Sequence, residues 1–169
     1  TSHSPARFGA LLRRPTIPPL HRYASLASLK YPDVQSTLRT SDAFPTQDVC
    51  ANLKDDAAAT ARMGAGTYAC ATGSFLPATA AERCCPRGGA CDDGRPPCPA
   101  VVGGSNPTYD TAWNTEAAAK AQPDVPLEIV YTDRAAAVAA AEADEVPLLL
   151  YGWEPDLFAS KDRFARVRM

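Results

Sequence analysis

The sequence lacks the features of several large classes of protein. No apolar run approaches the ~20 residues that a helix needs to cross a bilayer, so no membrane span is expected. Charge of one sign is also lacking, since 17 basic residues stand against 19 acidic ones, and this balance argues against nucleic acid as a partner. Aromatic residues make up only 8% of the chain, and alanine, which buries little area, supplies much of the 46% hydrophobic fraction.

Patterns typical of catalysis are scarce as well. The two histidines, His3 and His21, lie near the start of the chain, and no G-x-S-x-G motif of serine hydrolases is present. Residues 64–69 match the dinucleotide pattern G-x-G-x-x-A, but that fingerprint has to follow a strand, and here it follows an alanine-rich helical pattern. Since no nucleophile, base and orienting group stand together, we expect neither an enzyme nor a bound cofactor.

What the chain does hold is six cysteines gathered in one stretch. They are Cys50, Cys70, Cys84, Cys85, Cys91 and Cys98. An even number of clustered cysteines is typical of a disulfide framework. The neighbours Cys84 and Cys85 are not expected to pair with each other, because that ring is strained. Six cysteines allow fifteen pairings, and the choice among them stays open.

The spacing of these cysteines also bears on metal and on compartment. Cys85, Cys91 and Cys98 are separated by gaps of five and six residues, which do not match the paired knuckles of a zinc site. We therefore expect disulfides and no metal. Disulfides persist in oxidising surroundings, so the predicted location is extracellular or in the lumen of the secretory pathway.

Composition divides the chain into four regions. Residues 1–19 are proline-rich and basic without an acidic residue, and are expected to form an extended lead-in. Residues 20–63 are expected to form a helical segment of the domain. Residues 64–107 are rich in glycine, proline and cysteine with no apolar period, which predicts an irregular insertion loop held by disulfides. Residues 108–169 are expected to hold a strand, a helix and a second strand.

Helical spacing of apolar residues over 20–29, together with capping and stop signals further on, predicts four helices before the final unit. They cover residues 20–29, 33–38, 53–63 and 112–121. The first has to end before Pro32, because proline disfavours helical conformation in the residue before it. Asn52 is a candidate N-cap for the third of these helices, and Gly64 lies just past its end.

The last third of the sequence carries the strongest pattern. Residues 127–131 read as an apolar strand, and Thr132 and Asp133 are expected to cap an alanine-rich helix over 134–143. Residues 146–151 read as a second strand, apolar throughout its centre, as expected for a strand covered on both faces. A strand, a helix and a strand at this spacing predict a parallel βαβ unit and an α/β fold.

This unit predicts where a ligand would bind. In open parallel sheets the ligand lies beyond the carboxyl ends of the strands, here at Thr132 and Asp133 and at the corner that follows Tyr151. That corner holds Trp153, whose ring face could attract a quaternary ammonium group by about 0.5 to 2 kcal/mol. The alternative is that Trp153 only packs the strand end against Leu157 and Phe158.

At this corner the residues resemble a known family. Residues 146–169, VPLLLYGWEPDLFASKDRFARVRM, are similar to the closing motif of glycine betaine/proline-type substrate-binding domains of ABC transporters. Residues 127–145 resemble that family's strand followed by an alanine-rich helix, and residues 111–130 resemble the segment that leads into this strand. The likeness covers about residues 110–169, and residues 20–63 more weakly.

The resemblance implies part of a two-lobed fold like that of periplasmic binding proteins, with the cysteine-rich stretch as an insertion. It implies a small zwitterionic or quaternary-ammonium ligand, with Trp153 in an aromatic cage and Thr132, Asp133 and Tyr151 as further candidate ligand residues. A full domain of this kind is longer, so the chain is expected to be a segment of a larger protein. The rest of that polypeptide, or other subunits, would then be its partners.

Asp133 supports an alternative. The family carries a small hydroxyl residue or glycine at this corner, and a carboxylate there would repel the carboxylate of a ligand. The second hypothesis is therefore a structural or interaction domain of an extracellular assembly that has lost ligand binding.

Overall fold

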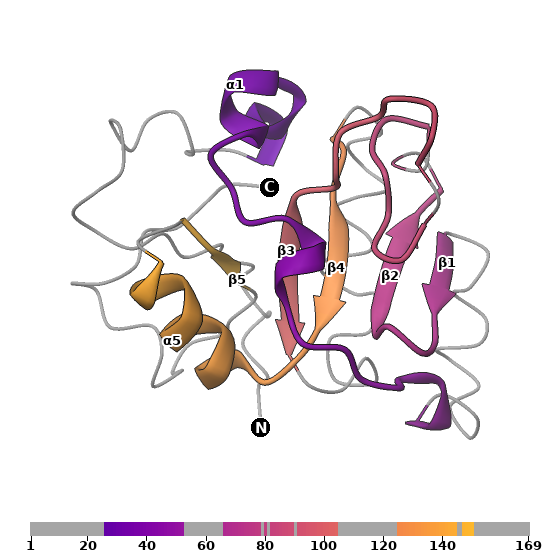
Figure 1. Ribbon diagram of the computed structural model, residues 1–169, viewed down its shortest axis with the longest axis vertical. Helices are drawn as coiled ribbons and strands as arrows, with labels where there is room; N and C mark the ends of the chain where they lie inside the picture. The colour runs from indigo at the N-terminus through magenta and orange to yellow at the C-terminus, as the bar shows by residue number, and fades with distance from the viewer. Residues whose placement is uncertain are drawn as a thin grey trace, which may run out of the picture.

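A five-stranded mixed sheet lies at the centre of the part of the chain that the structure describes. The computed structural model describes residues 26–52, 66–78, 80, 82–89, 91–104, 125–144 and 147–150. The strands are β1 (Gly66–Ala69), β2 (Ser74–Pro77), β3 (Ala100–Gly104), β4 (Glu128–Tyr131) and β5 (Leu149–Leu150), in the order β1-β2-β4-β3-β5 (Figure 1). β2 pairs antiparallel with β1 and β4, whereas β3 pairs parallel with β4 and β5. The chain therefore mixes helices and strands, as the sequence predicts.

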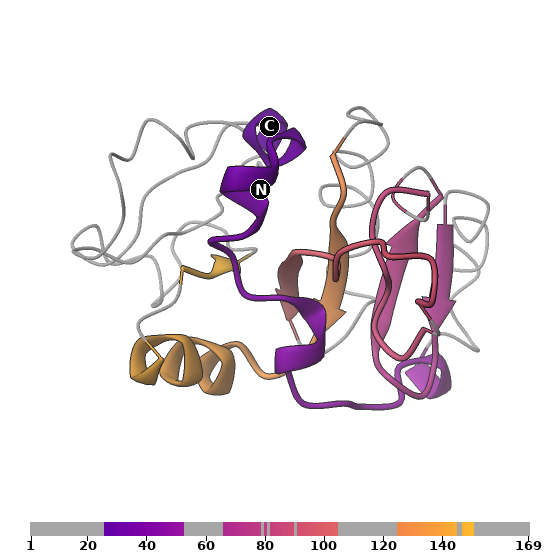
Figure 2. The ribbon, with the colours of Figure 1, turned by 45° about the horizontal axis from the view of Figure 1, so that its top comes forward.

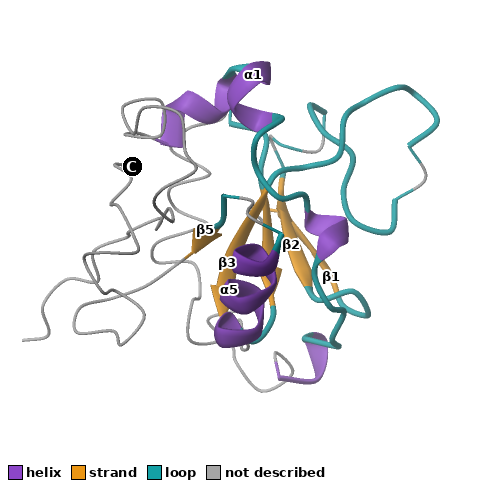
Figure 3. Ribbon diagram, turned by 60° about the vertical axis from the view of Figure 1, so that its left-hand side comes forward, coloured by secondary structure: helices purple, strands orange, loops and turns teal. Residues whose placement is uncertain are grey.

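Within the described residues, the helices are short except for one. The α-helices are α1 (Pro32–Gln35) and α5 (Arg134–Ala143), and the 3₁₀ helices are η2 (Leu26–Lys30), η3 (Ser41–Ala43) and η4 (Cys50–Asn52). Seen from the side, α5 lies over one face of the sheet in front of β3 (Figure 3). Its buried residues Ala137, Val138 and Ala141 form one side of the helix, and the small alanine side chains let it approach the strands closely.

The helix predictions upstream have mixed outcomes. The helix expected over 33–38 is present as α1, which begins earlier, with Pro32 in its first turn, and ends sooner. Proline suits that turn because its missing N–H has no helical acceptor there. Of the helix expected over 20–29, the described part is the 3₁₀ helix η2. The lead-in over 1–19 and the helices expected over 53–63 and 112–121 lie outside the described residues.

The predicted strand-helix-strand unit is confirmed as β4, α5 and β5. The two strands are parallel, but they are not neighbours, because β3 lies between them and pairs with both. Figure 2 shows α5 and β5 on the side of β3 that faces away from β4. An earlier segment of the chain thus supplies the central strand of the parallel part of the sheet.

The main core lies between α5 and the sheet. Its members are Phe44, Ala100, Val102, Val130, Ala137, Val138, Ala141, Leu148 and Leu150. Val101, Ile129 and Leu149, which alternate with these residues along their strands, are also buried, and so is Phe75 on β2. Burial on both faces explains the unbroken apolar sequence of the central strands.

The prediction of an irregular loop over residues 64–107 was wrong. This stretch contributes β1, β2 and β3, which are three of the strands in the sheet. Each has only four or five residues and stands among glycines, prolines and cysteines, so no alternating pattern is long enough to be recognised. Pairing with neighbouring strands, which no local pattern encodes, fixes these strands.

Candidate functional site

The carboxyl ends of β3, β4 and β5 meet at one edge of the sheet. The register pairs Val102 with Val130 on one side and with Leu150 on the other, so the three parallel strands end nearly level. The chain passes from β3 to β4 in one direction and then returns across β3 to β5. Open α/β sheets bind ligands where the strand order reverses in this way, outside the carboxyl ends of the strands.

Two glycines end the central strand at this edge. The pairing of β3 with β4 shifts between Val102 and Gly104, so that Gly104 lies opposite Tyr131 and Gly103 is the extra residue. Such irregularities change the course of a strand, and residues without a Cβ let another group approach the backbone. Gly103 and Gly104 were not among the residues predicted from the sequence. The signal that could have found them is a glycine pair directly after a short apolar run.

Thr132 and Asp133 follow β4 at the same edge, where the sequence places them. Thr132 is buried, with 4% of its surface exposed. Asp133 is exposed, and its Oδ1 accepts a hydrogen bond of 2.8 Å from the backbone N–H of Ala136. The cap prediction is therefore confirmed for Asp133, which is the N-cap of α5. This carboxylate places negative charge at the helix N-terminus, where an anion would otherwise be favoured.

The structure brings only part of the predicted ligand site together. Thr132 and Asp133 are adjacent at the carboxyl edge, next to Gly104. Tyr151 and Trp153 lie outside the described residues, as does the rest of the corner after β5. Their contribution to the site stays a prediction from the sequence.

All six cysteines are paired in disulfides. The pairs are Cys50–Cys70, Cys84–Cys98 and Cys85–Cys91, with Cα–Cα distances of 5.0, 4.9 and 5.7 Å. The prediction of disulfides is confirmed, and Cys84 and Cys85 each have a different partner. Cys85–Cys91 lies within the segment that Cys84–Cys98 encloses, so one bridge is nested in the other. Cys84 and Cys98 pack with Ala80 in a small second core.

A buried polar cluster lies at the opposite end of β4. Glu128, the first residue of the strand, is fully buried, and its Oε2 accepts a hydrogen bond of 2.9 Å from the backbone N–H of Arg87. The Arg87 side chain, 6% exposed, donates from Nη2 to the carbonyl oxygen of Phe44. Burial lowers the pKa of the Arg87 guanidinium, while the negative charges of Glu128 and Asp42 act in the opposite direction. This cluster was not predicted from the sequence.

Two polar atoms of this cluster have no hydrogen-bond partner among the described residues. They are Glu128 Oε1 and Arg87 Nη1. A buried carboxylate that keeps only one hydrogen bond depends strongly on that bond, because an unpaired buried charge is costly. The hydrogen bond from Arg87 to Glu128 is therefore more important for the stability of β4 than its donor–acceptor distance alone indicates.

The described residues also bear on whether the chain has a metal site or a membrane span. Within them, no group of three or more His, Cys, Asp or Glu side chains is placed to hold a metal ion. The same residues contain no helix long and apolar enough to cross a membrane.

No protein family, curated protein or solved structure matches this chain. The likeness to substrate-binding domains rests on the sequence patterns alone.

Proposed function

We propose that the chain is a non-catalytic ligand-binding module, with its site at the carboxyl edge of β3 and its two parallel neighbours, β4 and β5. The observation that carries this proposal is the reversal of strand order at the glycine pair that ends β3. Gly103 and Gly104 place no side chain at the end of β3, and β4 is followed by the buried hydroxyl of Thr132 and the exposed carboxylate of Asp133. This combination suits a small polar ligand better than a macromolecule.

The charge at this edge favours a cationic ligand. Asp133 is exposed and already bonded to the N-terminus of α5, so a ligand carboxylate gains little there and meets a like charge. Trp153 follows β5 by three positions in the sequence, and an indole face is the best aromatic partner for a quaternary ammonium group. The proposed ligand class is therefore small quaternary ammonium compounds, choline before glycine betaine.

The wider setting of the module is part of the same proposal. The sequence resemblance supports one portion of a two-lobed domain within a larger polypeptide. The three disulfides support an extracellular or lumenal location, because such bridges persist in oxidising compartments.

Calorimetric titration tests the proposal. Choline, glycine betaine and proline are each titrated into the oxidised full chain and into Trp153→Ala. Loss of the indole is expected to weaken choline binding on the order of tenfold, the equivalent of about 1.4 kcal/mol within the cation–π range. Tyr31→Ala is the matched control, because Tyr31 is an aromatic that is 53% exposed on another part of the molecule. Absence of heat with all three compounds contradicts the proposal.

A structural or interaction domain remains the second candidate. The observation that favours it is the segment between Cys84 and Cys98, which two disulfides hold while Asp92, Asp93 and Gly94 are exposed. A rigid exposed segment of this kind loses little entropy when it contacts another protein. Failure of all three titrations, with Cys84–Cys98 intact, would favour this candidate.

A further inference from the structure

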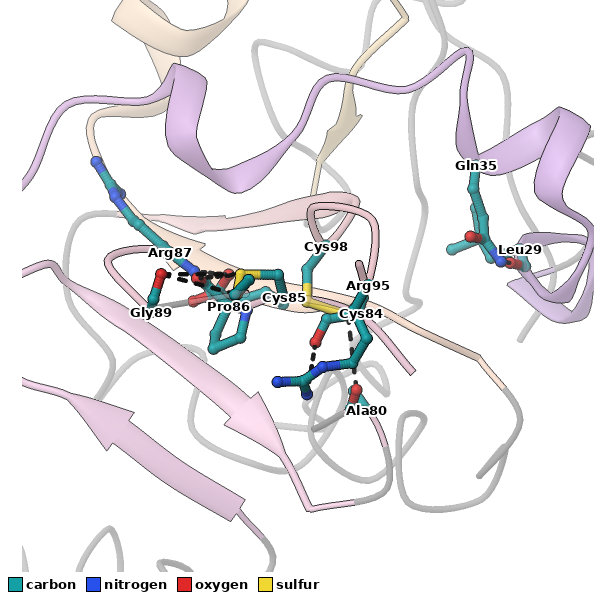
Figure 4. The surroundings of a disulfide bond; sticks show 12 residues. Leu29, Gln35, Ala80, Cys84, Cys85, Pro86, Arg87, Gly89, Arg95 and Cys98 are labelled. Atoms are coloured by element: carbon teal, nitrogen blue, oxygen red, sulfur yellow. Dashed lines mark hydrogen bonds between the residues drawn. A yellow bond between two sulfur atoms is a disulfide. The ribbon is translucent and has the colours of Figure 1, made fainter. Parts of the chain in front are cut away.

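A small disulfide ring holds Arg87 against the sheet. Cys85 and Cys91 are six positions apart and bonded to each other. Inside the ring, Gly88 has a φ of +70°, and the N–H of Gly89 donates to the carbonyl oxygen of Pro86. Figure 4 shows the Arg87 side chain extending away from this turn. The ring thus fixes the direction in which Arg87 leaves the loop.

Arg87 joins three parts of the molecule. Its backbone N–H bonds to Glu128 on β4, and its guanidinium bonds to the carbonyl oxygen of Phe44, which follows η3. Phe44 itself is part of the main core. Release of Arg87 would leave the Glu128 carboxylate buried with no hydrogen bond from the described residues, since Oε1 already has none. The position of this one residue therefore affects both the sheet and the segment across it.

The two nested disulfides differ in exposure. Cys84 and Cys98 are both fully buried, whereas Cys85 and Cys91 are partly exposed. Disulfide exchange needs access of a thiolate to one of the sulfur atoms. A reductant can therefore reach Cys85–Cys91 in the folded protein, but it reaches Cys84–Cys98 only after the second core opens.

We propose that Cys85–Cys91 is a redox-sensitive clamp that controls whether Arg87 is docked on Glu128. A dithiol reductant supplies two electrons and two protons, the S–S bond breaks, Cys85 and Cys91 become thiols, and the reductant becomes a disulfide. The ring then opens and Arg87 leaves Glu128, while Cys84–Cys98 keeps the ends of the loop in place. The device is independent of ligand binding at the carboxyl edge.

The chain offers a matched control in Cys50–Cys70. This bridge is also accessible, since Cys70 is exposed. The hydrogen bonds beside it run from Val49 N–H to the carbonyl oxygen of Cys70 and from Cys50 N–H to the Asp48 carboxylate, and neither involves Glu128. Reduction of Cys50–Cys70 is therefore expected to leave the Arg87 contact intact.

Graded reduction of the full chain with dithiothreitol tests the clamp. Alkylation followed by mass spectrometry identifies the free thiols, and hydrogen exchange reports the protection of individual backbone amides. Cys85 and Cys91 are expected to be alkylated before Cys84 and Cys98. Protection of the Arg87 amide is then expected to fall on the order of tenfold or more, as for loss of a buried hydrogen bond. Reoxidation should restore it.

Two variants separate the clamp from general loosening. The double variant C85S/C91S should show the low Arg87 protection without reductant, and C50S/C70S should keep the protection of the oxidised wild type. If C85S/C91S does not fold, the partly reduced wild type gives the same comparison. Continued protection of Arg87 with Cys85–Cys91 open, or simultaneous reduction of Cys84–Cys98, overturns the proposal.

Discussion

The backbone N–H of Arg87 donates a hydrogen bond to Glu128, 41 positions along the chain, over a distance of 2.9 Å. This bond joins the cysteine-rich loop to the first residue of β4, and both residues are buried. Since β4 pairs with β2 on one side and β3 on the other, the contact supports the centre of the sheet.

Replacement of Glu128 tests the strength of this contact. Glu128→Ala leaves the Arg87 amide buried without its acceptor and the Arg87 guanidinium without the opposite charge of Glu128, and we expect the free energy of unfolding to fall by about 3 kcal/mol. Glu128→Gln keeps an acceptor oxygen for the Arg87 amide, so it should cost about 1 kcal/mol. Urea unfolding of both variants measures the difference. Equal losses in the two variants would show that the hydrogen bond to Arg87 is unimportant.

Gly73 in the turn between β1 and β2 is expected to tolerate no side chain. Its φ is +76°, and a Cβ there would lie 2.5 Å from the backbone oxygen of Gln47. Gly94 is the matched control, because its φ is +78° but a Cβ would meet nothing within 4 Å. We expect Gly94→Ala to cost about 1 kcal/mol and Gly73→Ala about 3 kcal/mol, since only the second adds a backbone clash. Similar midpoints of thermal unfolding for the two variants would contradict this.

Asp133 caps α5, and its removal should weaken that helix. Asp133→Ala loses the bond to the Ala136 amide and is expected to lower the free energy of unfolding by about 1 kcal/mol. Asp133→Asn keeps an acceptor and should stay close to the wild type. Urea unfolding followed by circular dichroism checks both. A loss in Asp133→Asn as large as in Asp133→Ala would show that charge, rather than capping, is what matters.

Asp93 gives the exposed tip of the disulfide loop a dependence on pH. The Asp93 carboxylate accepts a hydrogen bond from the backbone N–H of Arg95 and another, of 2.6 Å, from Nε of the Arg95 side chain. These contacts lower the pKa of Asp93 below its ordinary value of 3.8. A lowered pKa in the folded protein means that this contribution to stability is fully present above pH 3.8 and is lost as the pH falls through the folded pKa. Carbon-13 NMR of the Asp93 carboxyl should show a midpoint below 3.8, and Arg95→Ala should raise it. A midpoint at or above 3.8 in the wild type contradicts the prediction.

The sequence predicted those parts of the fold that are determined locally. An apolar run, the capping residue Asp133 and an alanine-rich stretch in succession were enough to predict β4, α5 and β5. The neighbours of these strands were not predictable in this way. Residues Ala100–Gly104 become the central parallel strand only because β4 and β5 lie on either side of them, and their own five residues carry no period.

The candidate site residues also divide into those that a local pattern predicts and those that only the folded chain brings together. Thr132 and Asp133 were predicted because they directly follow a recognisable strand. Arg87 and Glu128 were missed because each looks ordinary in its own segment, and only the folded loop brings them together. The pairing of the cysteines could not be predicted from the sequence either, because neighbouring cysteines with short gaps allow many pairings that close loops of similar length.

The most direct test of the account is an NMR titration of the nitrogen-15-labelled, oxidised full chain with choline, because it reports both binding and location. We predict saturable shifts of the amide signals of Gly103, Gly104, Thr132 and Asp133, with those of Arg87 and Glu128, at the opposite end of the sheet, unchanged. Absence of shifts at these four amides, or shifts confined to other parts of the chain, would contradict a ligand site at the carboxyl edge of β3 and β4.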